Sequence, residues 1–189
     1  MSRRLAILLV AAAAGCGSGD APTVNTQAME AYLGLDSSID KALNLAFVGM
    51  NSAATANIAP ETIGGDAKGQ LVVMGQVDQG TSSSRTIRVD TVYSGYSDDG
   101  DTLYATDAAA PPLLALELNG VPYGTLSGTF LGVFTMSGLL VGPLTVQLTF
   151  DGQLQPVGRM GGVARVMYST HIHGTAVSDY GTYAVDFTR

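Results

Sequence analysis

Two histidines, His171 and His173, are the side chains of this sequence whose types and spacing most clearly suggest chemistry. They are the only histidines in the chain, and residues two apart on a strand point to the same face of a sheet. Zinc sites on β-sheets use this spacing, together with a third ligand and neighbours that orient the rings. Glu117, Asp179 and Asp186 are candidates for that third ligand, although the sequence does not place any of them beside the pair. The alternative, which we favour, is a polar strand face without a metal.

A second group of possible ligands is the acidic turn at residues 98–101, with Asp107 nearby. Its sequence, Asp-Asp-Gly-Asp, offers the carboxylate oxygens that calcium prefers. The spacing does not match the EF-hand loop, in which three alternating ligand positions precede the glycine. We therefore expect a solvated loop between strands, with a weak calcium site as the alternative.

Catalytic motifs are scarce. The sequence has no G-x-S-x-G turn between a strand and a helix, which would present a nucleophilic serine. It contains only three glutamates, and its carboxylates show no spacing typical of paired acid–base groups. We expect no catalytic residues and conclude that the protein is not an enzyme.

The first residues have the organisation of a signal peptide. Arg3 and Arg4 precede a ten-residue apolar run at 5–14, which is shorter than the ~20 residues that a membrane-spanning helix needs. The only cysteine, Cys16, follows Ala-Ala-Gly. We expect residues 1–15 to be a signal peptide, residues 16–24 a flexible tether, and residues 25–189 a single domain.

The segment Ala13-Ala14-Gly15-Cys16 resembles the lipobox of bacterial lipoproteins, although Ala13 stands where leucine is usual. This resemblance implies lipidation at Cys16, attachment to the membrane through that lipid, and a location in the cell envelope. Gly17, instead of the aspartate associated with inner-membrane retention, implies the outer membrane. Residues 69–189 also resemble uncharacterised β-rich bacterial lipoproteins with Gly/Thr/Ser-rich antiparallel strands, a resemblance that implies a fold but no activity.

The composition excludes several classes of protein. Loss of residues 1–15 removes two arginines and no acidic residue, which changes the formal net charge from −7 to −9. Nucleic acid is therefore not expected as a partner. A single cysteine cannot form a disulfide within the chain, and 46% hydrophobic content with 13% charged residues predicts a folded core.

Helical periodicity is confined to the N-terminal part of the domain. We expect a short helix at residues 25–33 and a longer one at residues 37–50, separated near Gly34 and Asp36. The second helix has one apolar face, which should pack on a sheet. That face consists of Ile39, Ala42, Leu43, Ala46, Phe47 and Met50.

Beyond a connector at 51–68, the sequence alternates with the period of strands. Short turns join the segments without intervening helices, which predicts an antiparallel meander. The fold class is mainly β with an N-terminal helical segment packed on a curled meander or a partly open barrel of about seven strands. The expected strands are residues 70–78, 86–95, 113–118, 124–136, 144–151, 163–176 and 180–188.

We therefore expect a membrane-anchored cell-envelope lipoprotein with a non-catalytic structural or interaction role, and an envelope protein is one candidate partner. One alternative is a carrier that binds a lipid or another hydrophobic ligand in the trough of the sheet. Another is a metal site at His171 and His173. A trough filled by the helix face of Ile39, Leu43, Phe47 and Met50 favours the structural role, whereas a cavity of several hundred cubic ångströms favours the carrier.

Overall fold

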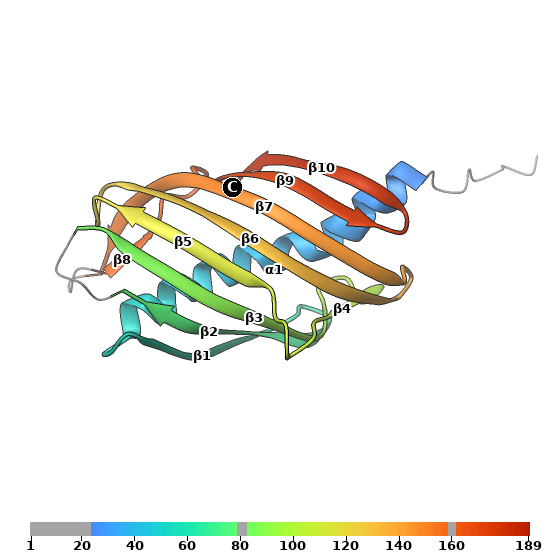
Figure 1. Ribbon diagram of the computed structural model, residues 1–189, viewed down its shortest axis with the longest axis horizontal. Coiled ribbons are helices and arrows are strands. Elements are labelled where there is room, and N and C mark those ends of the chain that lie inside the picture. Colours follow the sequence, from blue (N-terminus) through green and yellow to red (C-terminus); the bar gives the residue numbers. More distant parts are fainter. Residues whose placement is uncertain (1–23, 79–82, 159–161) are drawn as a thin grey trace, which may run out of the picture.

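The computed structural model describes residues 24–78, 83–158 and 162–189, which form one helix followed by ten strands (Figure 1). This confirms the expected mainly β fold with an N-terminal helix. The elements are α1 (Val24–Ser52), β1 (Asn57–Gly64), β2 (Lys68–Val77), β3 (Arg85–Ser97), β4 (Thr102–Ala105), β5 (Leu113–Asn119), β6 (Thr125–Gly138), β7 (Gly142–Val157), β8 (Gly162–Arg165), β9 (His171–Ser178) and β10 (Gly181–Thr188).

All strand pairs are antiparallel, and the chain runs through the sheet as a meander. The strand order is β1-β2-β3-β4-β6-β7-β9-β10. β4 and β5 share one position, because each pairs with β3 on one side and with β6 on the other. β8 pairs with the last residues of β7, beyond the part of β7 that pairs with β9.

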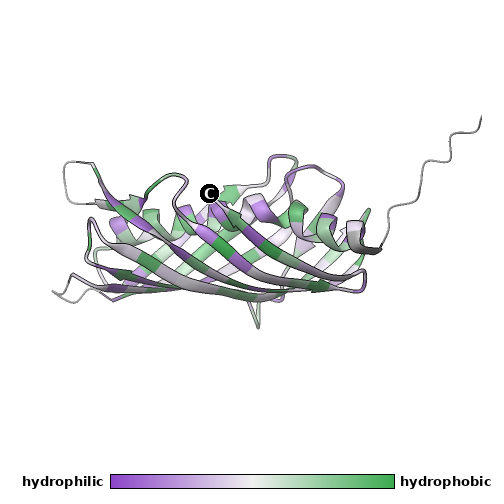
Figure 2. Ribbon diagram, turned by 90° about the horizontal axis from the view of Figure 1, so that it is seen from above, coloured by the Kyte–Doolittle hydropathy of each residue, from purple (hydrophilic) through white to green (hydrophobic). Residues whose placement is uncertain are grey.

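The sheet curls around α1 into a partly ring-like shape that stays open. β1 and β10 are the two ends of the strand path, and they lie at opposite sides of the sheet in Figure 1. Seen from above, the sheet is shallow and concave, and the helix lies along its concave side (Figure 2). The helix contacts strands from both halves of the sheet, among them β1, β2, β3, β9 and β10.

One face of α1 supplies the helical half of the core. The predicted apolar face is confirmed, because Ile39, Leu43 and Phe47 are buried and Met50 packs partly buried against the same core. Among the described residues, no helix is both long enough and apolar enough to cross a membrane.

The alternation read from the sequence is clearest in β6 and β7, where every second side chain is buried. Phe130 and Phe134 of β6 face the helix together with Leu144 and Phe150 of β7. Gly128 lies on the same inward face, where a Cβ would overlap the carbonyl oxygen of Ala115 on β5. The absence of a side chain there lets the neighbouring strands bend closely together.

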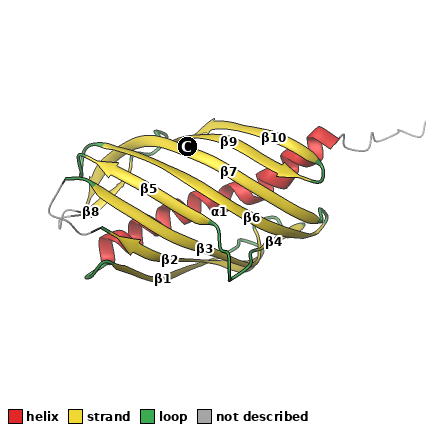
Figure 3. Ribbon diagram, viewed as in Figure 1, coloured by secondary structure: helices red, strands yellow, loops and turns green. Residues whose placement is uncertain are grey.

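The prediction of two helices is wrong, because α1 runs without interruption through Gly34 and Asp36 (Figure 3). Gly34 is not a break. The ring of Tyr104 packs directly on its backbone, leaving no room for a Cβ. Asp36 is buried rather than at a helix end, and it accepts a hydrogen bond from Tyr32 at 3.0 Å.

The number of strands exceeds the predicted seven for three reasons. β1 lies inside the expected connector at 51–68, where Pro60 and mostly exposed side chains hide the alternation of an edge strand. β4 has only four residues, too few for a periodic signal. The expected strand 163–176 is two strands, because the chain turns between them through Tyr168, whose φ is 61°.

Candidate functional site: a groove between the helix and β8

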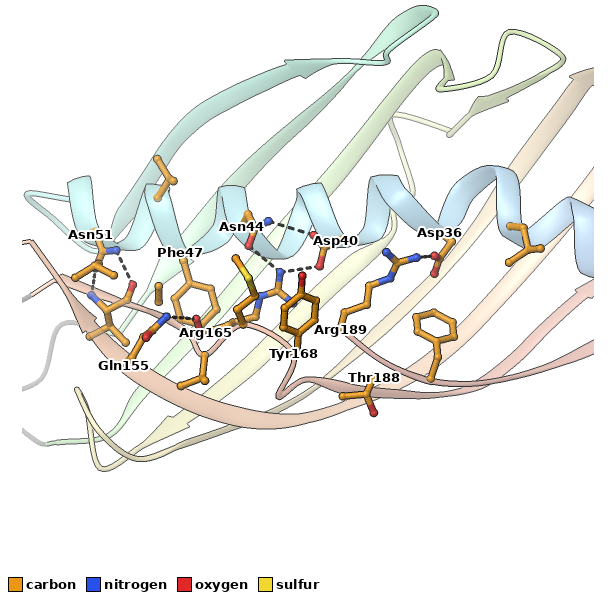
Figure 4. A pocket seen from close by; sticks show the side chains of 18 residues that line it. Asp36, Asp40, Asn44, Phe47, Asn51, Gln155, Arg165, Tyr168, Thr188 and Arg189 are labelled. Carbon is orange, nitrogen blue, oxygen red and sulfur yellow. Dashed lines mark hydrogen bonds and ion pairs between the residues drawn. The ribbon is translucent and has the colours of Figure 1, made fainter.

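A groove of about 830 Å³ lies between α1 and the last strands of the sheet (Figure 4). Its helical wall is one flank of α1, from Leu33 to Asn51, beside the face that packs on the core. The opposite wall contains the end of β7, β8 with the turn that follows it, and the end of β10. The described lining is Leu33, Asp36, Asp40, Asn44, Phe47, Val48, Asn51, Gln155, Val157, Val163, Ala164, Arg165, Val166, Met167, Tyr168, Phe187, Thr188 and Arg189.

Much of the groove surface is apolar and open to solvent. Five of the twelve large hydrophobic side chains that are exposed in the described residues lie here, with exposed fractions from 38% to 78%. A concentration of exposed apolar side chains on one surface is typical of a ligand or partner site rather than of an ordinary surface. The five residues are Leu33, Val48, Val157, Met167 and Tyr168.

Arg165, the last residue of β8, reaches across the groove to the helix. Its Nη2 donates to Asp40 Oδ1 and to Asn44 Oδ1, each at 2.7 Å. Its Nη1 makes a longer contact of 3.4 Å with Thr170 Oγ1. The side chain is only 10% exposed, and its Nε is shielded from solvent with no hydrogen-bond partner among the described residues.

Amide side chains hold the two walls of the groove at a fixed separation. Asn51 Nδ2 donates to the carbonyl of Val163 at 2.8 Å, and the Val163 N–H donates to Asn51 Oδ1 at 3.0 Å. On the same side, Gln155 Nε2 donates to the carbonyl of Arg165 at 2.9 Å. The two Asn51 bonds pin the end of α1 to β8, and the Gln155 bond joins β7 to β8 within the opposite wall, so the groove is preformed.

The other end of the groove contains a buried ion pair. Arg189 Nη2 contacts the carboxylate of Asp36, which also accepts the hydroxyl of Tyr32. Burial raises the pKa of Tyr32 well above its ordinary value, although the charge of Arg189 partly opposes the shift. Tyr32 is therefore a hydrogen-bond donor at neutral pH. The Arg189 guanidinium lies 5.2 Å from the Phe187 ring centre, within the range of a cation–π contact.

The charges that line the groove balance one another. The described lining contains two arginines, Arg165 and Arg189, and two aspartates, Asp40 and Asp36, and each arginine is bonded to one aspartate. The groove therefore combines apolar surface with polar groups at fixed positions, and the formal charges of its described lining side chains sum to zero.

The two histidines lie elsewhere, on the opposite face of β9 from the buried Ile172. Their rings stack with centroids 4.9 Å apart, which confirms that they share a face. Of the three candidate ligands, Asp186 lies beside the pair, with Oδ1 2.7 Å from His171 Nε2. Glu117 is on β5 and Asp179 in the turn after β9. In the part of the chain that the structure describes, no group of three or more His, Cys, Asp or Glu could hold a metal ion.

The acidic turn is tied into the fold rather than simply solvated. Asp98 accepts hydrogen bonds from Lys41 Nζ at 2.8 Å, from the Asp66 N–H at 2.9 Å and from Tyr96 Oη at 2.7 Å. Burial alone would raise the pKa of Asp98, but these donors outweigh it and hold the pKa below its ordinary value. Asp99 accepts the Ser97 hydroxyl at 2.9 Å. These carboxylates therefore already accept hydrogen bonds from donors of the chain itself.

Cys16, the predicted lipidation site, lies outside the described residues. The groove was not predicted from the sequence. One signal was present in the helix, where polar side chains recur at intervals of four, four and seven residues beside the apolar face. These residues are Asp36, Asp40, Asn44 and Asn51. Asp and Asn are less usual than Glu or Lys on a merely solvated helix face, so this stripe indicated polar contacts with another element.

Comparisons of the chain with protein-family models, with curated protein sequences and with solved structures found no match.

Proposed function

We propose that the protein is a lipid-anchored protein of the bacterial cell envelope that binds a hydrophobic or amphipathic molecule in the groove between α1 and β8, without catalysis. The observation that carries this proposal is the groove of about 830 Å³ with its exposed apolar side chains. Its volume falls within the range of small-molecule sites, about 300–1,000 Å³. Binding a ligand would remove that apolar surface from water, which is the main driving force for such association.

The proposed binding site is not the one that the sequence suggested. The hollow of the sheet is filled, because Ile39, Leu43 and Phe47 of α1 are buried against the strands. The groove lies along one flank of the same helix, between the helix and β8. A carrier role thus depends on this flank of α1 and on β8, whereas the curled sheet serves as the scaffold that holds both.

The anchor is supported by the sequence of the first residues. A basic start, a short apolar run and one cysteine after Ala-Ala-Gly form a pattern typical of lipoproteins. With a formal charge of −9 after loss of residues 1–15, the surface would not be attracted to anionic lipid. A lipid on Cys16 would instead hold the groove near a membrane, which is a source of amphipathic ligands, and the outer membrane is the location that Gly17 favours.

Native mass spectrometry of the full chain purified from a bacterial envelope tests the binding role. The Val48→Arg variant places a charge in the groove, and Val133→Arg places the same charge on the exposed far face of β6 as a matched control. We expect a co-purifying ligand mass on the unaltered protein and on Val133→Arg, but not on Val48→Arg. No ligand mass on the unaltered protein, or its retention by Val48→Arg, would overturn the proposal.

The anchor has its own test. Cells expressing the full chain are supplied with radiolabelled palmitate and then fractionated. We expect label on the unaltered protein in the membrane fraction. The Cys16→Ser variant should be unlabelled and should move to the soluble fraction. Label on Cys16→Ser would contradict lipidation at this residue.

A further inference from the structure

Arg165 has more hydrogen-bond donors than its partners use. A guanidinium carries five N–H groups, and the strong bonds in the described structure, to Asp40 and Asn44, both use Nη2. The contact of Nη1 with Thr170 is long, at 3.4 Å, and no described residue accepts a hydrogen bond from Nε. Because the side chain is nine-tenths buried, water does not readily replace the missing acceptor, and a donor in this state is unfavourable.

Exposed apolar side chains line the groove on both sides of Arg165. Toward the C-terminal end of α1 these are Val48 and Val157. Toward the N-terminal end the lining contains Leu33 and the ion pair between Asp36 and Arg189. The groove therefore offers apolar surface for a ligand tail at Val48 and Val157, and an ion pair for a polar end on the other side of Arg165.

The charge of Arg165 is already balanced by Asp40 at 2.7 Å. A ligand carboxylate at the free donors would lie beside the Asp40 carboxylate, and like charges at such a separation repel one another. A neutral carbonyl oxygen accepts the same hydrogen bond without this repulsion. The site therefore suits an uncharged acceptor better than an anionic one.

We propose that the groove binds an acyl chain attached through an ester or amide, whose carbonyl oxygen accepts hydrogen bonds from Arg165. The acyl chain lies along Val48 and Val157, and the group attached to the carbonyl points toward Arg189. This inference rests on the proposed binding role and defines its ligand class. Because Nε is shielded from solvent, binding of the carbonyl requires a side chain beside Arg165 to move.

A matched pair of ligands tests the inference on the unaltered protein. 1-Dodecanoylglycerol and 1-O-dodecylglycerol have the same headgroup and nearly the same chain, but only the first has a carbonyl. Their affinities are measured by isothermal titration calorimetry of the full chain below their micelle concentrations. We expect the ester to bind roughly tenfold more tightly, the effect of one hydrogen bond to a charged donor, and dodecanoate at pH 7 to bind more weakly than the ester.

The outcomes separate this inference from the proposed function. If neither glycerol lipid binds, the binding role itself fails. If both bind equally, or if dodecanoate binds most tightly, the groove binds hydrophobic molecules but the carbonyl recognition is wrong. The Arg165→Lys variant retains a charge for Asp40 but has no Nε, so we expect it to lose the difference between ester and ether while keeping the affinity for the ether. A difference that survives in a folded Arg165→Lys protein would overturn the role of Arg165.

Discussion

The Tyr104 ring of β4 lies directly against the backbone of Gly34 in the middle of α1. The Tyr104 hydroxyl donates to the carbonyl of Ala31 at 2.9 Å, and a Cβ at position 34 would overlap that hydroxyl. Tyr104 is fully buried, and burial raises its pKa well above the ordinary value, so the hydroxyl stays protonated. The four residues of β4 thus fix the position of the helix over the sheet.

This contact predicts that Gly34→Ala destabilises the protein even though alanine is the better helix former. Overpacking at a buried contact costs about 1–3 kcal/mol, which exceeds the ~1 kcal/mol that alanine contributes to helix propensity. Tyr104→Phe removes the overlapping hydroxyl, so the double variant should be more stable than the sum of the two single changes predicts. Urea unfolding of the four proteins gives the coupling free energy. Additive effects would show that the overlap is not what excludes a side chain at position 34.

Gly34 also shows why the helices could not be predicted fully from sequence. A glycine inside a helical pattern is read as a break, because it lowers helix propensity. Here it allows a ring from a residue 70 positions later to touch the backbone, and only the tertiary fold reveals that contact. By contrast, β6 was predicted almost to its ends, because burial of one face and exposure of the other dictate its residue types directly. The prediction for β7 was correct over residues 144–151 but missed the continuation of the strand to Val157.

The candidate site was less predictable than the fold. The histidine pair was visible because its two members are two residues apart, and the structure confirms that they share a face. The groove instead brings Arg165 to Asp40, 125 residues away in the chain. Periodicity describes neighbours within one element, and so it could not pair a short strand with one flank of the helix.

The ion pair between Asp36 and Arg189 should contribute to stability. The Asp36 side chain is 6% exposed, whereas that of Arg189 is 40% exposed. Arg189→Gln leaves a buried carboxylate without its cation, which is costly, and the partial exposure of Arg189 lowers the expected loss to about 1–3 kcal/mol. Unfolding in urea at pH 7 measures this loss.

Two further variants establish the cause of that loss. Arg88→Gln removes an arginine from the exposed face of β3, and we expect a change within ~0.5 kcal/mol. In the Asp36→Asn background, Arg189→Gln should cost much less than it does alone. Equal costs in both backgrounds would show that the Arg189 side chain stabilises the fold by packing on Phe187 instead.

The histidine pair predicts no large response to zinc. Zinc sites use three or four protein ligands, and the nearest acidic oxygen, on Asp186, is already 2.7 Å from His171 Nε2 in a largely exposed position. We expect equimolar zinc to leave the Tm of the unaltered protein unchanged. Zinc should likewise leave the Tm of the His171→Ala variant unchanged. A zinc-dependent rise in Tm that His171→Ala abolishes would instead establish the metal site, with Asp186 as its third ligand.

Asp98 predicts a stability that declines in acid. Its donors hold its pKa below the ordinary value of 3.8 in the folded state, so the unfolded chain takes up the proton first as the pH falls. The contribution of Asp98 is therefore complete above about pH 5 and is lost as the pH falls through the lower pKa of the folded state. Asp98→Asn should cost about 1–2 kcal/mol at pH 7 through weaker hydrogen bonds, and that cost should shrink toward pH 2.

Asp66→Asn is the matched control for this pH dependence, because Asp66 also accepts from Lys41, at 2.9 Å, but its side chain is 72% exposed. An exposed ion pair contributes at most about 1 kcal/mol, so the control should change the stability little between pH 7 and pH 2. Urea unfolding at several pH values measures both variants. We expect the free energies of unfolding of the unaltered protein and of Asp98→Asn, plotted against pH, to converge at low pH. A constant separation between them would mean that Asp98 stabilises the fold through its shape and packing, and not through the charge that Lys41, Tyr96 and the Asp66 N–H surround.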